Sequence, residues 1–106
     1  MKVLITGASS GIGKDMATIL ASTYDELVLV GRNKERLTNL KEELESSNKV
    51  KVKLVPTDLS DYKNCIKLYE ENKDVDLLIN DAGFGDYGKF IDTDLIIQEK
   101  EKILIL

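Results

Sequence analysis

Four short apolar runs alternate with segments of helical periodicity along this chain, and this alternation constrains the fold more than any other feature. The runs lie at residues 3–5, 27–30, 50–54 and 75–80. Strands that alternate with helices of about 10–15 residues indicate parallel β-α-β units. Because such crossovers are right-handed, the helices lie on the faces of one sheet. We therefore predict an α/β domain with a doubly wound parallel sheet and helices on both faces.

The residue pattern of each run predicts its place in the sheet. The first two runs are apolar on both faces, as expected of strands that helices cover on both sides. In the third run Lys51 and Lys53 alternate with apolar residues, which suits a protected edge strand. The fourth run resembles an interior strand, although no obvious partner follows it. We predict the strand order 3-2-1-4 in a truncated sheet, with ligands bound at the switch point between strands 1 and 4.

Apolar stripes and capping residues define three helices. We predict that Asn33 and Ser60 cap the second and third helix, because their side-chain oxygens can accept hydrogen bonds from the first turn. The stripes consist of Ile12, Met16, Ile19 and Leu20, then Leu37, Leu40 and Leu44, then Cys65, Ile66, Leu68 and Tyr69. We interpret Tyr62 and Tyr69 as packing residues, and Cys65 as a buried structural thiol.

The composition fits one small globular domain and argues against several classes of partner. The chain has 106 residues, of which 42% are hydrophobic and 32% charged. Its net charge of −4 argues against a nucleic acid or an anionic membrane, because both attract basic surfaces. With no histidine and one cysteine, we expect no metal site. The chain has neither a signal-peptide pattern nor an apolar run near the roughly 18 residues that span a bilayer, so we expect a cytoplasmic protein.

A glycine-rich loop joins the first strand to the first helix, and its residues fit a phosphate cradle. Gly7 permits a tight turn, Gly11 lets the backbone approach a pyrophosphate, and Gly13 lets the helix pack close to the sheet. The helix N-terminus then offers unpaired N–H groups and a positive dipole to the anion. A plain structural turn is the alternative, because glycines also mark turns. The predicted contacts in this loop are Gly7, Ser9, Ser10, Gly11, Ile12 and Gly13.

Three motifs in this order resemble those of the short-chain dehydrogenase/reductase family. They are the spacing Gly7-x-x-x-Gly11-x-Gly13, the segment Asp58-Leu59-Ser60 after the third strand, and Asn80-Asp81-Ala82-Gly83 at the end of the fourth. The resemblance covers residues 1 to about 95, roughly the first two fifths of a typical member. It implies a Rossmann-like fold, with a dinucleotide-binding half at residues 1–94 and a divergent tail at residues 95–106.

The end of the second strand predicts NADP rather than NAD as the cofactor. NAD-binding proteins of this type place a carboxylate there for the ribose hydroxyls, whereas this chain has Gly31 followed by Arg32. A guanidinium can hold a 2′-phosphate through forked, charge-assisted hydrogen bonds. Ser9 and Ser10 can add hydroxyl donors, and we include Asn33 in the same site. The alternative for Arg32 is a solvated loop cation.

The other two motifs imply contacts further along the cofactor. By resemblance, Asp58 accepts a hydrogen bond from the adenine amino group, with Leu59 beside it; a turn or capping carboxylate is the alternative. Asn80 lies near the nicotinamide-side ribose, where Ala82 and Gly83 let the backbone approach the cofactor; a strand-ending turn is the alternative. Asp81 departs from the family's second asparagine, and a carboxylate cannot donate as an amide does.

By resemblance, the whole protein is an oxidoreductase that transfers hydride between NADP(H) and a carbonyl or alcohol substrate. The family's catalytic tyrosine and lysine, in a Tyr-x-x-x-Lys arrangement, are expected beyond residue 106, so we assign no catalytic residue here. We expect the 106 residues alone to be inactive. The alternatives are a non-catalytic dinucleotide-binding module and a fragment that functions with a complementary chain.

The tail at residues 95–106 fits either a strand or a helix. Residues 102–106 have the composition of a strand that can pair with the fourth strand of the same chain or of a neighbour. A helix over residues 95–106 could instead cover the apolar sheet face. We expect the fourth strand to lie at an unprotected edge, and we hypothesise a homo-oligomer built around that strand and the tail.

Overall fold

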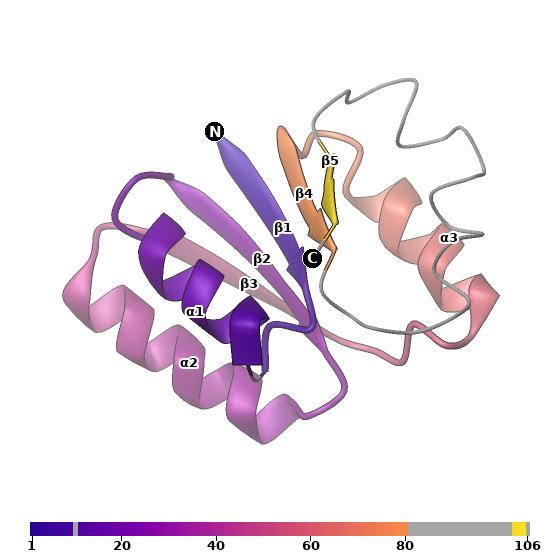
Figure 1. Ribbon diagram of the computed structural model, residues 1–106, viewed down its shortest axis with the longest axis horizontal. Coiled ribbons are helices and arrows are strands. Elements are labelled where there is room, and N and C mark those ends of the chain that lie inside the picture. Colours follow the sequence, from indigo (N-terminus) through magenta and orange to yellow (C-terminus); the bar gives the residue numbers. More distant parts are fainter. Residues whose placement is uncertain (10, 81–102, 106) are drawn as a thin grey trace.

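The computed structural model describes residues 1–9, 11–80 and 103–105, which form a parallel sheet with helices on both faces (Figure 1). The sheet has five strands in the order β3-β2-β1-β4-β5. The elements are β1 (Lys2–Thr6), α1 (Gly11–Leu20), β2 (Glu26–Gly31), α2 (Lys34–Ser47), β3 (Lys51–Pro56), α3 (Tyr62–Glu71), β4 (Leu77–Asn80) and β5 (Ile103–Ile105). The predicted α/β class and the order 3-2-1-4 are confirmed, and a fifth strand extends the sheet.

The first strand of the chain lies at the centre of the sheet. Val3 is in register with Leu27 of β2 on one side and with Leu77 of β4 on the other. Four of the five β1 residues are buried, because helices cover both faces of this strand. Lys51 and Lys53 are exposed on β3, which lies at one edge as predicted.

The other edge of the sheet differs from the sequence-based expectation. Ile103 is in register with Leu78, and Ile105 with Asn80, so β5 pairs in parallel with β4 of the same chain. The expectation that β4 lies at an unprotected edge is therefore wrong. Of the two conformations considered for the tail, residues 103–105 adopt the strand, while residues 95–102 lie outside the described part.

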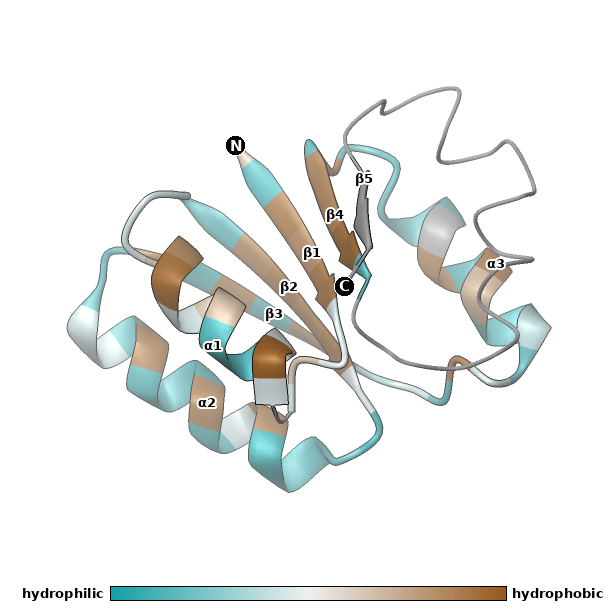
Figure 2. Cartoon of the chain, in the orientation of Figure 1, coloured by the Kyte–Doolittle hydropathy of each residue, from teal (hydrophilic) through white to brown (hydrophobic). Residues whose placement is uncertain are grey.

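Two apolar cores lie on opposite faces of the sheet. Figure 1 shows α1 and α2 on one face and α3 on the other, and Figure 2 shows that β1, β2 and β4 are largely hydrophobic. One core joins Val3, Ile5, Leu27 and Leu29 to Ala17, Leu37, Leu40 and Leu44. The other joins Leu4, Val28, Val30 and Leu78 to Leu59, Cys65 and Leu68. The predicted α2 stripe and the buried thiol of Cys65 are confirmed.

The stripe predicted for α1 is only partly correct. Ile12 and Ile19 are 57% and 63% exposed, whereas Met16 and Leu20 are half-buried against the core. Gly13 and Ala17 are the buried residues of this helix. Small residues let a helix lie close to a sheet, so the face of α1 that packs is set by residue size rather than by hydrophobicity.

One of the two predicted helix caps is confirmed. The Asn33 side chain accepts a hydrogen bond of 3.0 Å from the Arg36 N–H at the start of α2. At α3 the cap is Asp61, whose Oδ1 accepts from the Lys63 N–H at 2.9 Å. The prediction that Ser60 caps α3 is wrong, because its N–H and hydroxyl both donate to Asp58 Oδ1.

Candidate functional site

The loop between β1 and α1 contains two glycines in a backbone conformation that other residues disfavour. Gly7 and Gly11 adopt φ angles of 65° and 60°, a region that L side chains rarely occupy. A side chain on Gly11 would meet no atom within 4 Å, so the space above its backbone is open. The Ala8 N–H donates to the Val30 carbonyl at 3.1 Å and ties the loop to β2. This arrangement leaves the start of α1 accessible to a ligand.

The end of β2 lies directly beside this loop. A Cβ built on Gly31 would lie 3.2 Å from Ser9 Oγ, so these residues are in close contact although 22 positions separate them. The Gly31 carbonyl accepts from the Thr57 N–H at 2.9 Å, which brings the end of β3 to the same edge. Arg32 follows on the surface and is exposed. The carboxyl ends of β1, β2 and β3 thus converge, as the sequence predicts for a doubly wound sheet.

Asp58 occupies this edge as an exposed turn carboxylate. The Ser60 N–H and hydroxyl donate to its Oδ1 at 3.0 and 2.8 Å. The backbone hydrogen bond from Ser60 is the main cause that lowers the pKa of Asp58; the Ser60 hydroxyl adds to it, and so does the positive charge of Arg32. Asp58 therefore acts as a turn carboxylate, which was the alternative interpretation of this residue. Its Oδ2 has no hydrogen bond to a described residue. Leu59 is buried next to it, in the core under α3.

Asn80 lies at the end of β4, where it is joined to β1. Its side chain is 1% exposed, and its Oδ1 accepts from Thr6 Oγ1 at 3.3 Å. The Asn80 Nδ2 is buried without a partner among the described residues. This contact joins the two strands that flank the switch point. Ser10, Asp81, Ala82 and Gly83 lie outside the described residues.

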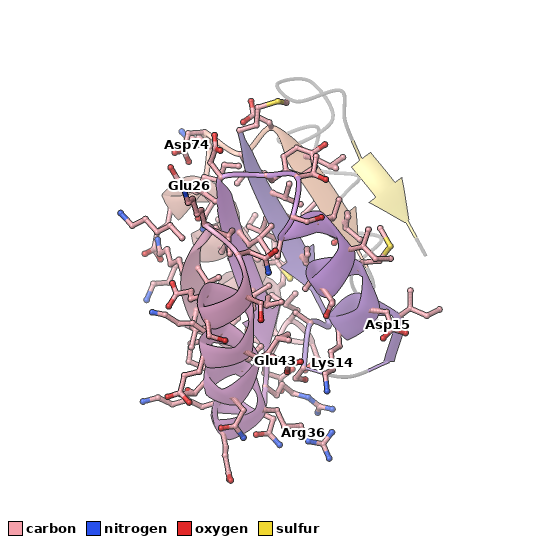
Figure 3. All side chains as sticks on the ribbon, turned by 90° about the vertical axis from the view of Figure 1, so that its left-hand side faces the viewer. Lys14, Asp15, Glu26, Arg36, Glu43 and Asp74 are labelled. Carbon is pink, nitrogen blue, oxygen red and sulfur yellow. The ribbon has the colours of Figure 1, made fainter. Side chains whose placement is uncertain are left out.

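A polar pocket between α1 and α2 adjoins the loop and was not predicted. Its volume is about 330 Å³, and it is lined by Ser9, Gly11, Lys14, Arg36, Asn39, Leu40 and Glu43. Figure 3 shows Lys14 and Glu43 on the facing sides of the two helices, with Arg36 near the start of α2. The two basic residues come from different helices, so only the tertiary fold brings them together. A strongly basic face on α2 would have indicated this pocket from the sequence. The helix also contains Glu35, Glu42 and Glu43, so its sequence shows no such basic face.

One Tyr-x-x-x-Lys spacing does occur in the chain, from Tyr69 to Lys73. It lies at the end of α3 that leads to the amino end of β4, whereas the glycine-rich loop follows the carboxyl end of β1. The two segments therefore lie at opposite ends of the parallel strands. This position in the fold argues against a catalytic role for this Tyr-x-x-x-Lys spacing.

Within residues 1–9, 11–80 and 103–105, no group of three or more metal-ligating side chains comes together. No helix in the same ranges is long and apolar enough to cross a membrane. The candidate site in the described part of the chain comprises the loop, the adjoining strand ends and the α1–α2 pocket.

The parallel sheet and the glycine-rich loop at its switch point define a Rossmann-like nucleotide-binding protein. The family model of the short chain dehydrogenases matches residues 1–101, and the chain belongs to this family. It is 40% identical over 84 residues to the very-long-chain 3-oxoacyl-CoA reductase of Candida glabrata. The matched segment covers 76% of this chain and 24% of that protein.

Solved structures of the family share the fold. A bulky-bulky ketone specific alcohol dehydrogenase from Comamonas testosteroni is 37% identical with a TM-score of 0.72, over 79% of this chain and 36% of that one. L-sorbose reductase from Gluconobacter frateurii, solved with NADPH and L-sorbose, is 32% identical with a TM-score of 0.72, over 79% of this chain and 34% of that one. The chain thus spans between about a quarter and about a third of the length of these relatives.

Proposed function

We propose that this chain is the NADP-binding part of an oxidoreductase that transfers hydride between NADP(H) and a carbonyl or alcohol substrate. The main support for NADP as the cofactor comes from the end of β2, where Gly31 and Arg32 lie beside the glycine-rich loop. No carboxylate is present there to accept from the ribose hydroxyls of NAD. A guanidinium at this position favours a ribose that carries a 2′-phosphate.

The remaining loop residues fit the pyrophosphate and the ribose of the same cofactor. In this proposal Gly7, Gly11 and Gly13 shape the turn, and the N–H groups at the start of α1 bind the pyrophosphate. The hydroxyls of Ser9 and Ser10 donate toward the phosphates, while Ile12 and Asn33 flank them. Lys14 and Arg36 in the adjoining pocket add positive charge near the predicted 2′-phosphate.

The adenine and the nicotinamide ends are assigned to the other two motifs. Asp58 accepts from the adenine amino group through the oxygen that Ser60 does not occupy, with Leu59 packed below. The positive charge of Arg32 helps to lower the pKa of Asp58. This closeness of the two residues supports a common adenosine site. Asn80, Ala82 and Gly83 are proposed to lie along the nicotinamide-side ribose.

Binding of NADPH and NADH to the 106-residue chain tests this proposal. We expect tighter binding of NADPH by isothermal titration calorimetry, and Arg32→Ala should weaken it by about 1.5–3 kcal/mol, because one charge-assisted contact is lost. Lys49→Ala removes the same charge from an exposed position before β3 and is the matched control. The same preparations should show no cofactor turnover with carbonyl or alcohol substrates. Equal affinities for the two cofactors, or a preference that survives Arg32→Ala, would contradict the proposal.

A further inference from the structure

β3 forms one edge of the sheet, and only some of its backbone groups point away from β2. The Lys51 N–H donates to the Asp25 carbonyl at 2.8 Å. Just past the other end of the strand, the Thr57 N–H donates to the Gly31 carbonyl at 2.9 Å. Both bonds point toward β2, and N–H groups alternate in direction along an extended strand. Residues 52, 54 and 56 therefore face outward, where a strand of another chain would have to pair.

Two of these three outward positions have no N–H to give to another strand. Glu45 reaches over from the C-terminal turn of α2, and its Oε2 accepts from the Val52 N–H at 3.0 Å. Residue 56 is a proline, which has no N–H. A residue that pairs in a ladder uses both its N–H and its carbonyl. Leu54 is thus the one outward residue of β3 that can pair fully, and a single residue is too little for a strand to add.

The hydrogen bond to Glu45 serves the strand rather than the helix that carries this residue. Carboxylates are disfavoured in the last turn of a helix, because the negative end of the helix dipole lies there. The C-terminal end of α2 is capped by Asn48 instead, whose N–H and Nδ2 both donate to the Leu44 carbonyl, at 3.0 and 3.1 Å. Lys51 and Lys53 also lie on this edge, but salt screens their charges, whereas the Glu45 carboxylate occupies the backbone donor itself.

We infer that Glu45 closes the β3 edge to strand pairing, so that a second copy of this chain can extend the sheet only at the opposite edge, beside β5. β5 ends the sheet on that side and, in the described part of the chain, pairs only with β4. The bond between Val52 and Glu45 closes the start of β3, and Pro56 closes its end. The inference is independent of the proposed cofactor.

Amide hydrogen exchange of the full chain tests this inference. It is measured by NMR at several protein concentrations in about 1 M salt, where a Debye length of about 3 Å screens the lysines. At low concentration the Val52 N–H should exchange about tenfold faster in Glu45→Ala than in the parent. At high concentration the Val52 and Leu54 N–H groups of this variant should become about tenfold more protected, because a second copy pairs with β3.

Three proteins should show no such dependence on concentration. They are the parent, Glu45→Gln, which keeps a side-chain acceptor, and Glu42→Ala, which removes a charge from an exposed site on the same helix. Association through β5 leaves the Val52 and Leu54 amides unchanged, so the measurement separates the two edges.

The inference is overturned if Val52 exchanges equally in Glu45→Ala and the parent, or if Leu54 of the variant exchanges equally at every concentration. Protection of Leu54 that rises with concentration in the parent overturns it as well. Pro56→Ala keeps the bond to Glu45 and supplies an outward N–H at the other end of β3. If Glu45→Ala does not fold, Pro56→Ala decides. Protection of its Leu54 N–H at high concentration supports the inference, and unchanged exchange there overturns it.

Discussion

At the scale of single residues, Asp58 makes the stability of the protein depend on pH. Its pKa is lowered from the ordinary value of 3.8, chiefly by the Ser60 N–H and then by the Ser60 hydroxyl. A lowered pKa in the folded state means that the stabilising contribution is complete above 3.8 and is lost as the pH falls through the folded-state pKa. We therefore expect the protein to lose this contribution in the acid range below that value.

Asp58→Asn checks this expectation, because the amide keeps an acceptor for Ser60 but does not titrate in this range. Urea midpoints are measured from neutral pH down to about pH 3, where carboxylates of low pKa titrate. The variant should show a shallower decline than the parent. Asp15→Asn, on the exposed side of α1, controls for the loss of one negative charge. Parallel declines of parent and Asp58→Asn would rule out this role of Asp58.

The sequence predicted those parts of the candidate site that follow from the strand order or from residues close together in the chain. Gly7 was predicted because it permits a tight turn, and Gly11 because it lets the backbone approach a pyrophosphate; both adopt positive φ angles. The Ser9–Gly31 contact and the pairing of Lys14 with Arg36 across a pocket depend on how loops and helices pack. Propensity and periodicity carry no information about such contacts, so these residues emerge only with the fold.

At the scale of elements, the start of α3 depends on Asp61. Its Oδ1 accepts from the Lys63 N–H, and its carbonyl accepts from the Asn64 N–H at 3.0 Å. We expect Asp61→Ala to destabilise the protein by about 1 kcal/mol, and Asp61→Ser to retain most of the stability, because serine also caps helices. Urea unfolding measures both. Ser60→Ala should lower the free energy of unfolding clearly less than Asp61→Ala. A larger loss for Ser60→Ala would show that Ser60, and not Asp61, caps α3.

Elements were predictable where hydrophobic periodicity alone determines burial. The Leu37, Leu40 and Leu44 stripe fixed the buried face of α2. In α1 the same reasoning failed for Ile12 and Ile19, because Gly13 and Ala17 offer closer packing to the sheet. For β5, a three-residue strand is too short for periodicity to separate it from a helix.

At the scale of the whole molecule, association of the chain stays a prediction. In the described part of the sheet β5 pairs only with β4, so its outer edge carries backbone groups that can pair with a second chain. We propose that two chains associate through this edge, and we expect the full chain to sediment as a dimer or larger species. A chain that ends at Ile91 should sediment as a smaller species. Identical sedimentation and stability of the two forms would refute the association.

The central place of β1 also has a consequence for how the protein is made. The Lys2 N–H donates to Asp76 Oδ2, and the Lys2 carbonyl accepts from the Asp76 N–H, at 2.8 Å each. The first strand is therefore completed by residues synthesised more than seventy positions later. Once β3 is synthesised, β1, β2 and β3 can pair, but the other side of β1 stays bare until β4 follows. A bare apolar strand is prone to aggregate. The nascent chain is therefore most vulnerable between the emergence of β3 and the emergence of β4 from the ribosome, and slower emergence of residues 57–76 would lengthen its need for a chaperone.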